Sequence, residues 1–311
     1  MSLHIASAPC CWGVDDVNNP HLPPWQKVLD EAAEAGYQGL ELGPYGYLPL
    51  DREVLGQALD ERGLTVVAGT IFDDLVAPAN LDSLIRQTHE ICGFLTQLPA
   101  QPGEPGQRFP APYLVLIDHV HAERSRYAGH SDQAPRLDAA QWTTLMEHIR
   151  TVAELASREY GIRAVVHPHA GGYIEFADEI RRLLADIPDA TAGLCLDTGH
   201  LYYSGMNPVT WIREHAARLD YLHFKDIDPR VFAEVMAGHV GFFDACAEGV
   251  MCPIGRGCID YDALYRLLQE IGYRGYVTVE QERDPRHADG SLADVTASLE
   301  YLKQQGFQAS L

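Results

Sequence analysis

Imidazole and carboxylate side chains follow several short apolar runs in the second half of this 311-residue chain. The runs and the polar groups that end them are Val165-Val166-His167-Pro168-His169, Cys195-Leu196-Asp197-Thr198-Gly199-His200, Leu222-His223-Phe224-Lys225 and Val277-Thr278-Val279-Glu280. Mixed His and carboxylate ligands suit Mn, Co, Fe or Zn better than Ca, which prefers oxygen ligands. The pattern therefore predicts one divalent metal site, provided that the runs end at the same place.

Glu280 is the most informative of these residues. The apolar run from Tyr276 to Val279 delivers a carboxylate to a strand end, where burial without solvent or a partner is costly. A single His or Asp after an apolar strand is more often a cap, a turn residue or a satisfied core group. The recurrence of such groups after four successive runs favours the metal site over that simpler interpretation.

Short β-rich runs alternate with longer amphipathic stretches, which is typical of βα units with a parallel sheet. The predicted strands are Leu3–Ala8, Gly39–Leu42, Thr65–Phe72, Tyr113–Ile117, Arg163–His167, Ala192–Leu196, Tyr221–Phe224 and Tyr276–Glu280. Eight strands, each followed by a helix, predict an α/β fold, a parallel eight-stranded (β/α)8 TIM barrel, as one domain over residues 1–311. In such a barrel the chemistry lies at the carboxyl ends of the strands.

Two insertions interrupt this alternation. Pro99–Pro112, before the fourth strand, predicts a loop on the strand-entry side. Asp226–Cys258, after the seventh strand, predicts an extended loop that folds over the strand-exit side as a lid, or else an insert that only packs on the domain. Trp12 and Glu41, after the first two strands, are expected to line the pocket. Arg124 and Arg126, after the fourth strand, are expected either to bind an anionic group or to be solvated loop charges.

The charge balance excludes several partners. The chain has 44 acidic residues against 23 Lys and Arg, a formal net charge of -21, which would repel nucleic acid or an anionic membrane at long range. No apolar stretch is long enough to span a membrane, and the seven cysteines show no CxxC spacing. The segment from Met1 to Cys11 is expected to be a first strand, not a signal peptide. We therefore expect a cytoplasmic protein. Its oligomeric state stays open, with a homo-oligomer as one alternative.

Several motifs taken together resemble a known family. They are Leu196-Asp197-Thr198-Gly199-His200 with Gly205-Met206-Asn207-Pro208, His223-Phe224-Lys225-Asp226, Pro253-Ile254-Gly255-Arg256-Gly257, and Val279-Glu280 with Asp284-Pro285. The ordered series is similar to the xylose-isomerase-like TIM barrels of sugar phosphate isomerases and epimerases, and most similar to the inosose dehydratase branch. The likeness extends over nearly the whole chain, from Trp12-Gly13 through Glu41-Leu42-Gly43 and His167 to Glu175.

The resemblance implies a single divalent ion, commonly manganese or cobalt, with magnesium, iron and zinc as alternatives. By similarity Asp197, His223 and Glu280 match three ligands. Most relatives end the fifth strand directly in a glutamate, whereas here the acid comes later, as Glu175. We expect Glu175 to be the fourth ligand, with His167 as its rival.

The resemblance also implies a reaction through an enediolate. The expected catalytic residues are Glu175, Glu280, His200 and Lys225, and the expected substrate-binding residues are Trp12, Glu41, His167, His169 and Arg256. The expected substrate is an unphosphorylated polyol, keto sugar or cyclitol. A dehydratase, which is a carbon–oxygen lyase, is favoured. The alternatives are an isomerase or epimerase, which would share the first steps, and a non-catalytic metal-binding barrel.

Overall fold

Eight parallel strands close into a barrel in the computed structural model, which describes residues 3–99 and 103–307. Around the barrel the strands follow the order β1, β10, β7, β6, β5, β4, β3, β2 and back to β1. Their bounds are β1 Leu3–Ser7, β2 Gly39–Glu41, β3 Thr65–Asp73, β4 Tyr113–Asp118, β5 Arg163–Val166, β6 Gly193–Asp197, β7 Leu219–Phe224 and β10 Gly275–Val279. The predicted (β/α)8 barrel is confirmed. The ends of each predicted strand differ from those of the observed strand by no more than two residues.

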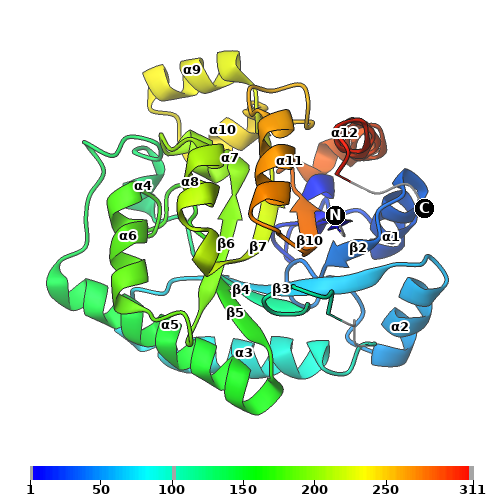
Figure 1. Cartoon of the computed structure of the whole chain (residues 1–311), viewed down its shortest axis with the longest axis horizontal. Coiled ribbons are helices and arrows are strands. Elements are labelled where there is room, and N and C mark those ends of the chain that lie inside the picture. Colours follow the sequence, from blue (N-terminus) through cyan, green and yellow to red (C-terminus); the bar gives the residue numbers. More distant parts are fainter. Residues whose placement is uncertain (1–2, 100–102, 308–311) are drawn as a thin grey trace.

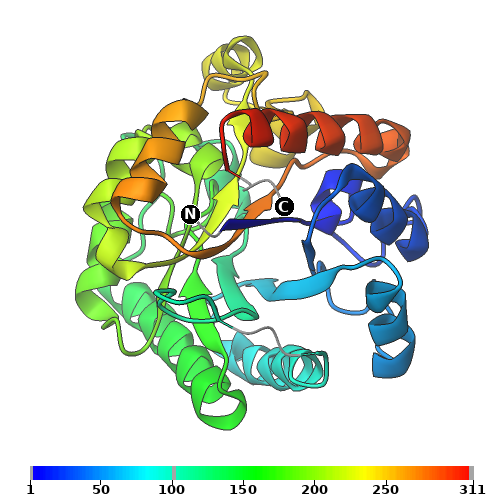
Figure 2. The same ribbon diagram turned by 45° about the vertical axis from the view of Figure 1, so that its right-hand side comes forward.

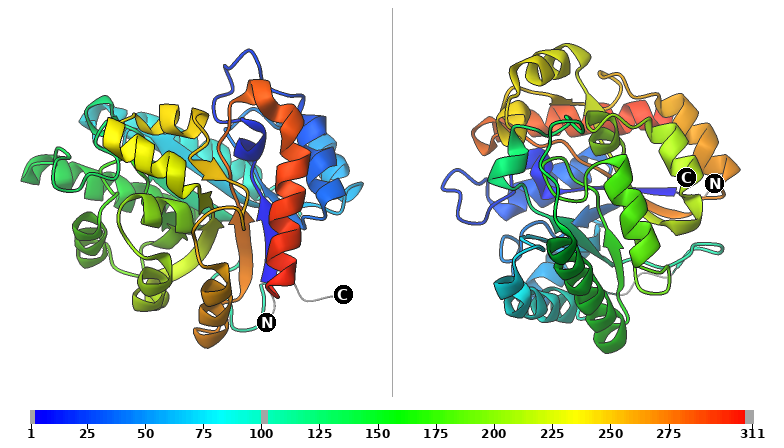
Figure 3. Two further views of the ribbon diagram at one scale, coloured as in Figure 1. Left: turned by 90° about the horizontal axis from the view of Figure 1, so that it is seen from above. Right: turned by 90° about the vertical axis from the view of Figure 1, so that its left-hand side faces the viewer.

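Helices surround the barrel on its outside (Figures 1 and 2). They are α1 Trp25–Ala35, α2 Arg52–Asp60, α3 Leu81–Leu95, α4 Ala122–Ser125, α5 Ala139–Tyr160, α6 Ala177–Asp186, α7 Thr198–Tyr203, α8 Pro208–Glu214, α11 Tyr261–Glu270 and α12 Ser291–Gln304. The last helix, α12, packs against α1, so that the helical layer closes where β1 meets β10 (Figure 3). No helix in the described parts of the chain is long and apolar enough to cross a membrane.

The alternation of side chains along each strand separates two apolar layers. On β4, Tyr113 and Val115 belong to the cluster that fills the barrel, whereas Leu114 and Leu116 belong to the larger cluster between strands and helices. Because both faces of the sheet are covered, both sets of residues are apolar. The barrel-facing position at the carboxyl end of each strand is therefore where a polar group can reach the mouth.

The segment after β7 contains more structure than a loop. It forms a two-stranded antiparallel pair, β8 (Asp226–Ile227) and β9 (Met251–Cys252), around the helices α9 (Pro229–Gly238) and α10 (Phe242–Ala247). The Asp226 carboxylate ties the pair together by accepting hydrogen bonds from the backbone N–H groups of Ile227, Gly255, Gly257 and Ile259. The other predicted insertion, Pro99–Pro112, lies partly outside the described residues.

Candidate metal centre and active site

Four side chains converge at the carboxyl ends of β5, β6, β7 and β10. His167, Asp197, His223 and Glu280 each offer one ligand atom, and these atoms all lie within 4.8 Å of one another. His223 Nδ1 is 3.0 Å from Glu280 Oε2 and 3.8 Å from Asp197 Oδ2, and His167 Nε2 is 3.5 Å from Asp197 Oδ2. We call these four residues the metal cluster.

Strand periodicity explains why these four side chains meet. Val165, Cys195 and Tyr221 face the barrel interior, so the residues two positions later point the same way at the mouth. Those residues are His167, Asp197 and His223. On β10, Thr278 is buried in the same way, and Glu280 follows it by two positions and points to the same face.

The cluster suits a divalent ion because three of its four ring nitrogen atoms lack a well-oriented hydrogen bond. His223 Nδ1, His167 Nδ1 and His167 Nε2 are buried without a hydrogen-bond partner among the described residues. Buried polar atoms normally have partners. Two imidazoles and two carboxylates also form a donor set that suits Mn, Fe, Co or Zn. The residues present therefore fit the metal that the sequence predicts.

Glu41, at the end of β2, orients one of these histidines. Its Oε1 accepts a hydrogen bond of 2.7 Å from His223 Nε2 and another of 2.7 Å from the Tyr221 hydroxyl. Because Nε2 donates to Glu41, Nδ1 is the ring nitrogen that faces Asp197 and Glu280. A carboxylate behind a ligating histidine is the usual partner in metal sites. Glu41, expected to bind substrate, is thus placed behind the cluster.

Lys225 is the buried cation of the mouth. Its Nζ donates to Asp197 Oδ2 at 2.8 Å, lies 3.2 Å from Glu282 Oε1 and also donates to Glu280 Oε2. Burial alone would lower the pKa of Lys225, but the negative charges of Asp197, Glu280 and Glu282 outweigh it and raise the pKa well above its usual value. Lys225 therefore stays protonated.

The positive charge of Lys225 in turn lowers the pKa values of the carboxylates beside it. Burial would raise the pKa of Asp197, but the charge of Lys225 and the nearby His167 ring hold it well below its usual range. Burial likewise opposes ionisation of Glu280, and the charges of His223 and Lys225 outweigh it and lower that pKa. Both carboxylates are therefore ionised and available as ligands.

Glu175, expected as the fourth ligand, lies outside the metal cluster. Its Oε1 accepts from the Gly129 N–H at 2.7 Å and the Ser204 hydroxyl at 2.9 Å, and its Oε2 accepts from the Gly171 N–H at 2.8 Å and Arg124 at 3.3 Å. The carboxylate therefore joins three loops rather than facing the cluster. His167, the rival that we named, is the fourth member of the metal cluster. Glu175 follows the strand by several residues, where strand periodicity no longer sets its direction.

Arg124 and Arg126, the two arginines after β4, lie in different surroundings, and neither faces the metal cluster. Arg124 is buried and pairs with Glu179 at 2.8 Å as well as with Glu175. Burial raises the pKa of Glu175 to about 7, against the opposing charge of Arg124. Arg126 is exposed on α4's C-terminal side. Neither of the two meets the metal cluster.

His169 and His200 lie beside the cluster with their rings 4.0 Å apart. His169 Nδ1 lies 2.8 Å from the Ala170 carbonyl, and His200 Nδ1 accepts from the Ala170 N–H at 3.0 Å. The proton is therefore on Nδ1 of His169 and on Nε2 of His200. Burial lowers the pKa of His169 to about 3 and lowers that of His200 well below its usual value, so both rings are neutral.

Trp12 and Arg256, both expected to bind substrate, differ in exposure. Trp12 is fully buried and donates its indole N–H to Glu31 at 2.6 Å. Arg256 is 65% exposed and lies 3.9 Å from Asp294 on α12.

Glu282 is a mouth residue that the sequence reasoning did not select. Its Oε1 lies near Lys225, while its Oε2 is buried without a hydrogen-bond partner among the described residues. Glu282 also forms a group with His169 and His200, whose ligand atoms lie within 4.8 Å of one another. The signal was present in the sequence, because Thr278, Glu280 and Glu282 are each two residues apart.

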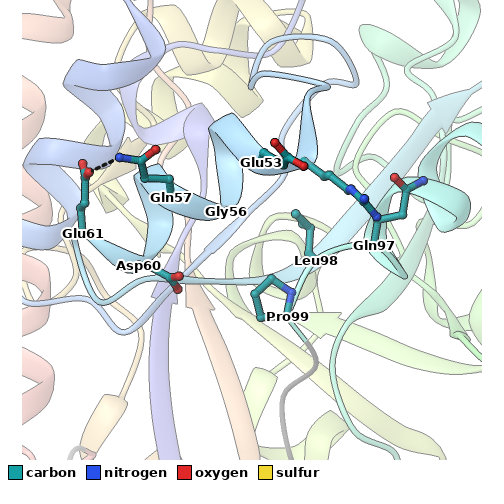
Figure 4. A pocket seen from close by; sticks show the side chains of 9 residues that line it. Glu53, Gly56, Gln57, Asp60, Glu61, Gln97, Leu98 and Pro99 are labelled. Carbon is teal, nitrogen blue, oxygen red and sulfur yellow. Dashed lines mark hydrogen bonds between the residues drawn. The ribbon is translucent and has the colours of Figure 1, made fainter.

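A surface groove of about 610 Å³ lies elsewhere, between α2 and the segment that follows α3 (Figure 4). Its lining includes Glu53, Asp60 and Glu61, and Gln57 donates a hydrogen bond to Glu61 there. None of the predicted site residues lines this groove. The chemically equipped site is therefore the mouth of the barrel.

Comparison with known proteins gives concordant results. The family model described as "Xylose isomerase-like TIM barrel" matches residues 29–305. The chain is 31% identical over 291 residues to the rhizopine catabolism protein MocC of Rhizobium meliloti, covering 93% of this chain and 84% of that protein. It is 30% identical over 310 residues to the inosose dehydratase of Erwinia tasmaniensis, covering 92% of each chain.

Solved structures share the fold at lower sequence identity. An L-ribulose 3-epimerase matches with a TM-score of 0.68 at 15% identity, covering 98% of this chain and 94% of that one. An IolI protein with a bound zinc atom matches with a TM-score of 0.67 at 15% identity, covering 97% and 99%. At these identities the structural matches bear on the fold alone.

Proposed function

Because this chain belongs to the xylose isomerase-like TIM barrel family, we propose that it is a divalent-metal-dependent dehydratase acting on a keto cyclitol such as inosose. The observation that carries the proposal is the metal cluster of His167, Asp197, His223 and Glu280, with its unpaired buried nitrogen atoms. The inosose dehydratases among the relatives support the choice of substrate.

In this proposal the four cluster residues hold the ion, and manganese or cobalt is the metal we expect. A bound divalent ion supplies a Lewis acid that polarises adjacent carbonyl and hydroxyl oxygens of the substrate. His167 replaces Glu175 as the fourth ligand, because the Glu175 carboxylate already accepts four hydrogen bonds. Glu41 keeps the lone pair of His223 Nδ1 directed at the cluster.

Dehydration requires a proton acceptor, a stabilised oxyanion and a leaving hydroxyl group. Glu280 accepts the proton from the carbon next to the carbonyl through Oε1, since Oε2 is occupied by Lys225 and His223. The electron pair of that C–H bond forms the enol, and its collapse expels the β-hydroxyl group. Lys225, fixed in its protonated form beside Asp197 and Glu280, stabilises the developing negative charge through its own positive charge. The departing hydroxide takes up the proton that Glu280 accepted and leaves as water, and the enol that remains tautomerises to the dione.

An epimerase is the second candidate, because the same enol yields an epimer if its carbon is reprotonated on the opposite face. Epimerases share this fold, as the L-ribulose 3-epimerase does. That outcome needs a second acid on the far face of the substrate. Glu175, which we expected to be catalytic, is held among three loops instead. The dehydratase is therefore the better-supported function.

The test is incubation of the manganese-loaded protein with inosose and with a panel of keto-hexoses in deuterated water. We expect loss of water from inosose, with a dione product visible by NMR. Solvent deuterium entering a keto-hexose without dehydration of inosose would support the epimerase instead. The variant E280Q should abolish both. Full activity in E280Q would contradict both catalytic proposals.

A further inference from the structure

Beside the metal cluster, His169, His200 and Glu282 converge on one point of the mouth, within 4.8 Å of one another. Two of their polar atoms, His200 Nε2 and Glu282 Oε2, are buried without a hydrogen-bond partner among the described residues. Such atoms cost free energy unless a ligand or water satisfies them. His200 is itself 2% exposed, so this group is built into the site.

The hydrogen bonds to Ala170 determine what each histidine can offer. His200 Nδ1 accepts from the Ala170 N–H, so its Nε2 carries a proton and is a donor. His169 Nδ1 donates to the Ala170 carbonyl, so its Nε2 is an acceptor. With Glu282 Oε2 as a further acceptor, the group presents one donor and two acceptors. Hydroxyl groups, which both donate and accept, match this set.

The charges around the group disfavour an anion. Lys225 is the cation within reach of Glu282, and it is already shared by Asp197 and Glu280 as well. In the described part of the chain, no arginine forms an ion pair or hydrogen bond with Glu282 or the metal cluster. Apart from the ion that the metal cluster would hold, a carboxylate on the substrate would therefore face Glu282 without a free counter-charge.

Aromatic side chains complete the surroundings. Phe242 of α10 packs against both rings, with centroids 5.0 Å from His169 and 5.3 Å from His200. Phe72 lies 5.5 Å from His169 and is 42% exposed. Such faces accommodate the C–H groups of a ring whose hydroxyls are hydrogen-bonded.

We propose that His169, His200 and Glu282 form a subsite for two hydroxyl groups of an uncharged ring, and that Glu282 makes the site reject rings that carry a carboxylate. This inference rests on the proposed function, because it places that substrate's hydroxyl groups. Its new content is the assignment of Glu282 as a specificity residue. The subsite prefers a cyclitol to a cyclic keto acid of the same ring size.

Direct binding tests this without turnover. Isothermal titration calorimetry on the manganese-loaded protein would compare myo-inositol, an uncharged ring, with quinate, a six-membered ring bearing a carboxylate. We expect the wild type to bind quinate at least about tenfold more weakly than myo-inositol. We expect E282Q to narrow that ratio by about tenfold, because it removes the charge and keeps the shape. E270Q, which changes the same charge in an exposed pair with Arg213, should keep the wild-type ratio.

Equal affinity of the wild type for both probes would overturn the proposal without any variant. An E282Q protein that loses both affinities in the same proportion would also overturn it, because a structural role has that effect. Inosose turnover is measured separately. A protein that prefers myo-inositol through Glu282 but does not dehydrate inosose would refute the reaction and leave the subsite standing.

Discussion

Replacing Glu41 by Gln tests whether the carboxylate behind His223 tunes the metal cluster. The Glu41 Oε1 accepts from His223 Nε2 and from the Tyr221 hydroxyl, both at 2.7 Å and both buried. E41Q keeps the side-chain shape and its acceptor oxygen but removes the negative charge. Hydrogen bonds to ionised groups are about twice as strong as neutral ones.

The expected cost follows from that difference. Converting one charge-assisted hydrogen bond to a neutral one loses about 1 to 2 kcal/mol. If this loss falls on the orientation and basicity of His223, the dissociation constant for the ion rises about 5- to 30-fold. Y221F, which removes the second donor but leaves the His223 contact, should weaken metal binding less than E41Q does.

The assay is titration of the metal-free protein with Mn²⁺ at neutral pH, in competition with a chromophoric chelator. Circular dichroism and Tm show whether each variant is folded. E270Q is the matched control, since it removes one negative charge from an exposed position far from the mouth. Wild-type metal affinity in a folded E41Q protein would refute the reasoning that Glu41 acts through His223.

Three further predictions address the fourth ligand, the buried imidazole and the segment after β7. H167A should lower metal affinity at least about tenfold, whereas E175Q should leave it unchanged; the reverse order in the same chelator titration would restore Glu175 as the ligand. The pKa of His169 is about 3 in the folded protein and 6.5 ordinarily. Between these two pH values the unfolded chain binds more protons than the folded one, so the free energy of unfolding falls as the pH drops from 6.5 to 3. The loss is up to about 1.4 kcal/mol per pH unit, and urea unfolding of the metal-free protein at several pH values should show a shallower dependence in H169Q. D226N replaces one of two carboxylate oxygens that each accept hydrogen bonds from two backbone N–H groups. We expect it to lower the free energy of unfolding by about 3 kcal/mol. Urea unfolding at the wild-type midpoint would contradict this prediction.

Periodicity made much of this protein predictable from its sequence. The eight strands are short apolar runs whose hydrophobic pattern depends only on neighbouring residues, so their positions could be read locally. His167, Asp197, His223 and Glu280 follow those runs in register with inward-facing residues. Since parallel strands of a barrel end at the same rim, the sequence predicted that these groups would gather there.

The partners of individual side chains depended on contacts between distant segments. Glu175 seemed the better ligand by type, but its direction is set by Gly129, Gly171 and Ser204, which come from three separate loops. Likewise Glu41 reaches His223 across 182 positions of the chain. Strand periodicity says which face a residue occupies, whereas a loop residue turns towards whichever donors the closed barrel brings to it. The sequence therefore determined the barrel and the rim that carries the cluster, and only the tertiary structure decided which acids belong to the metal cluster and which one supports the loops.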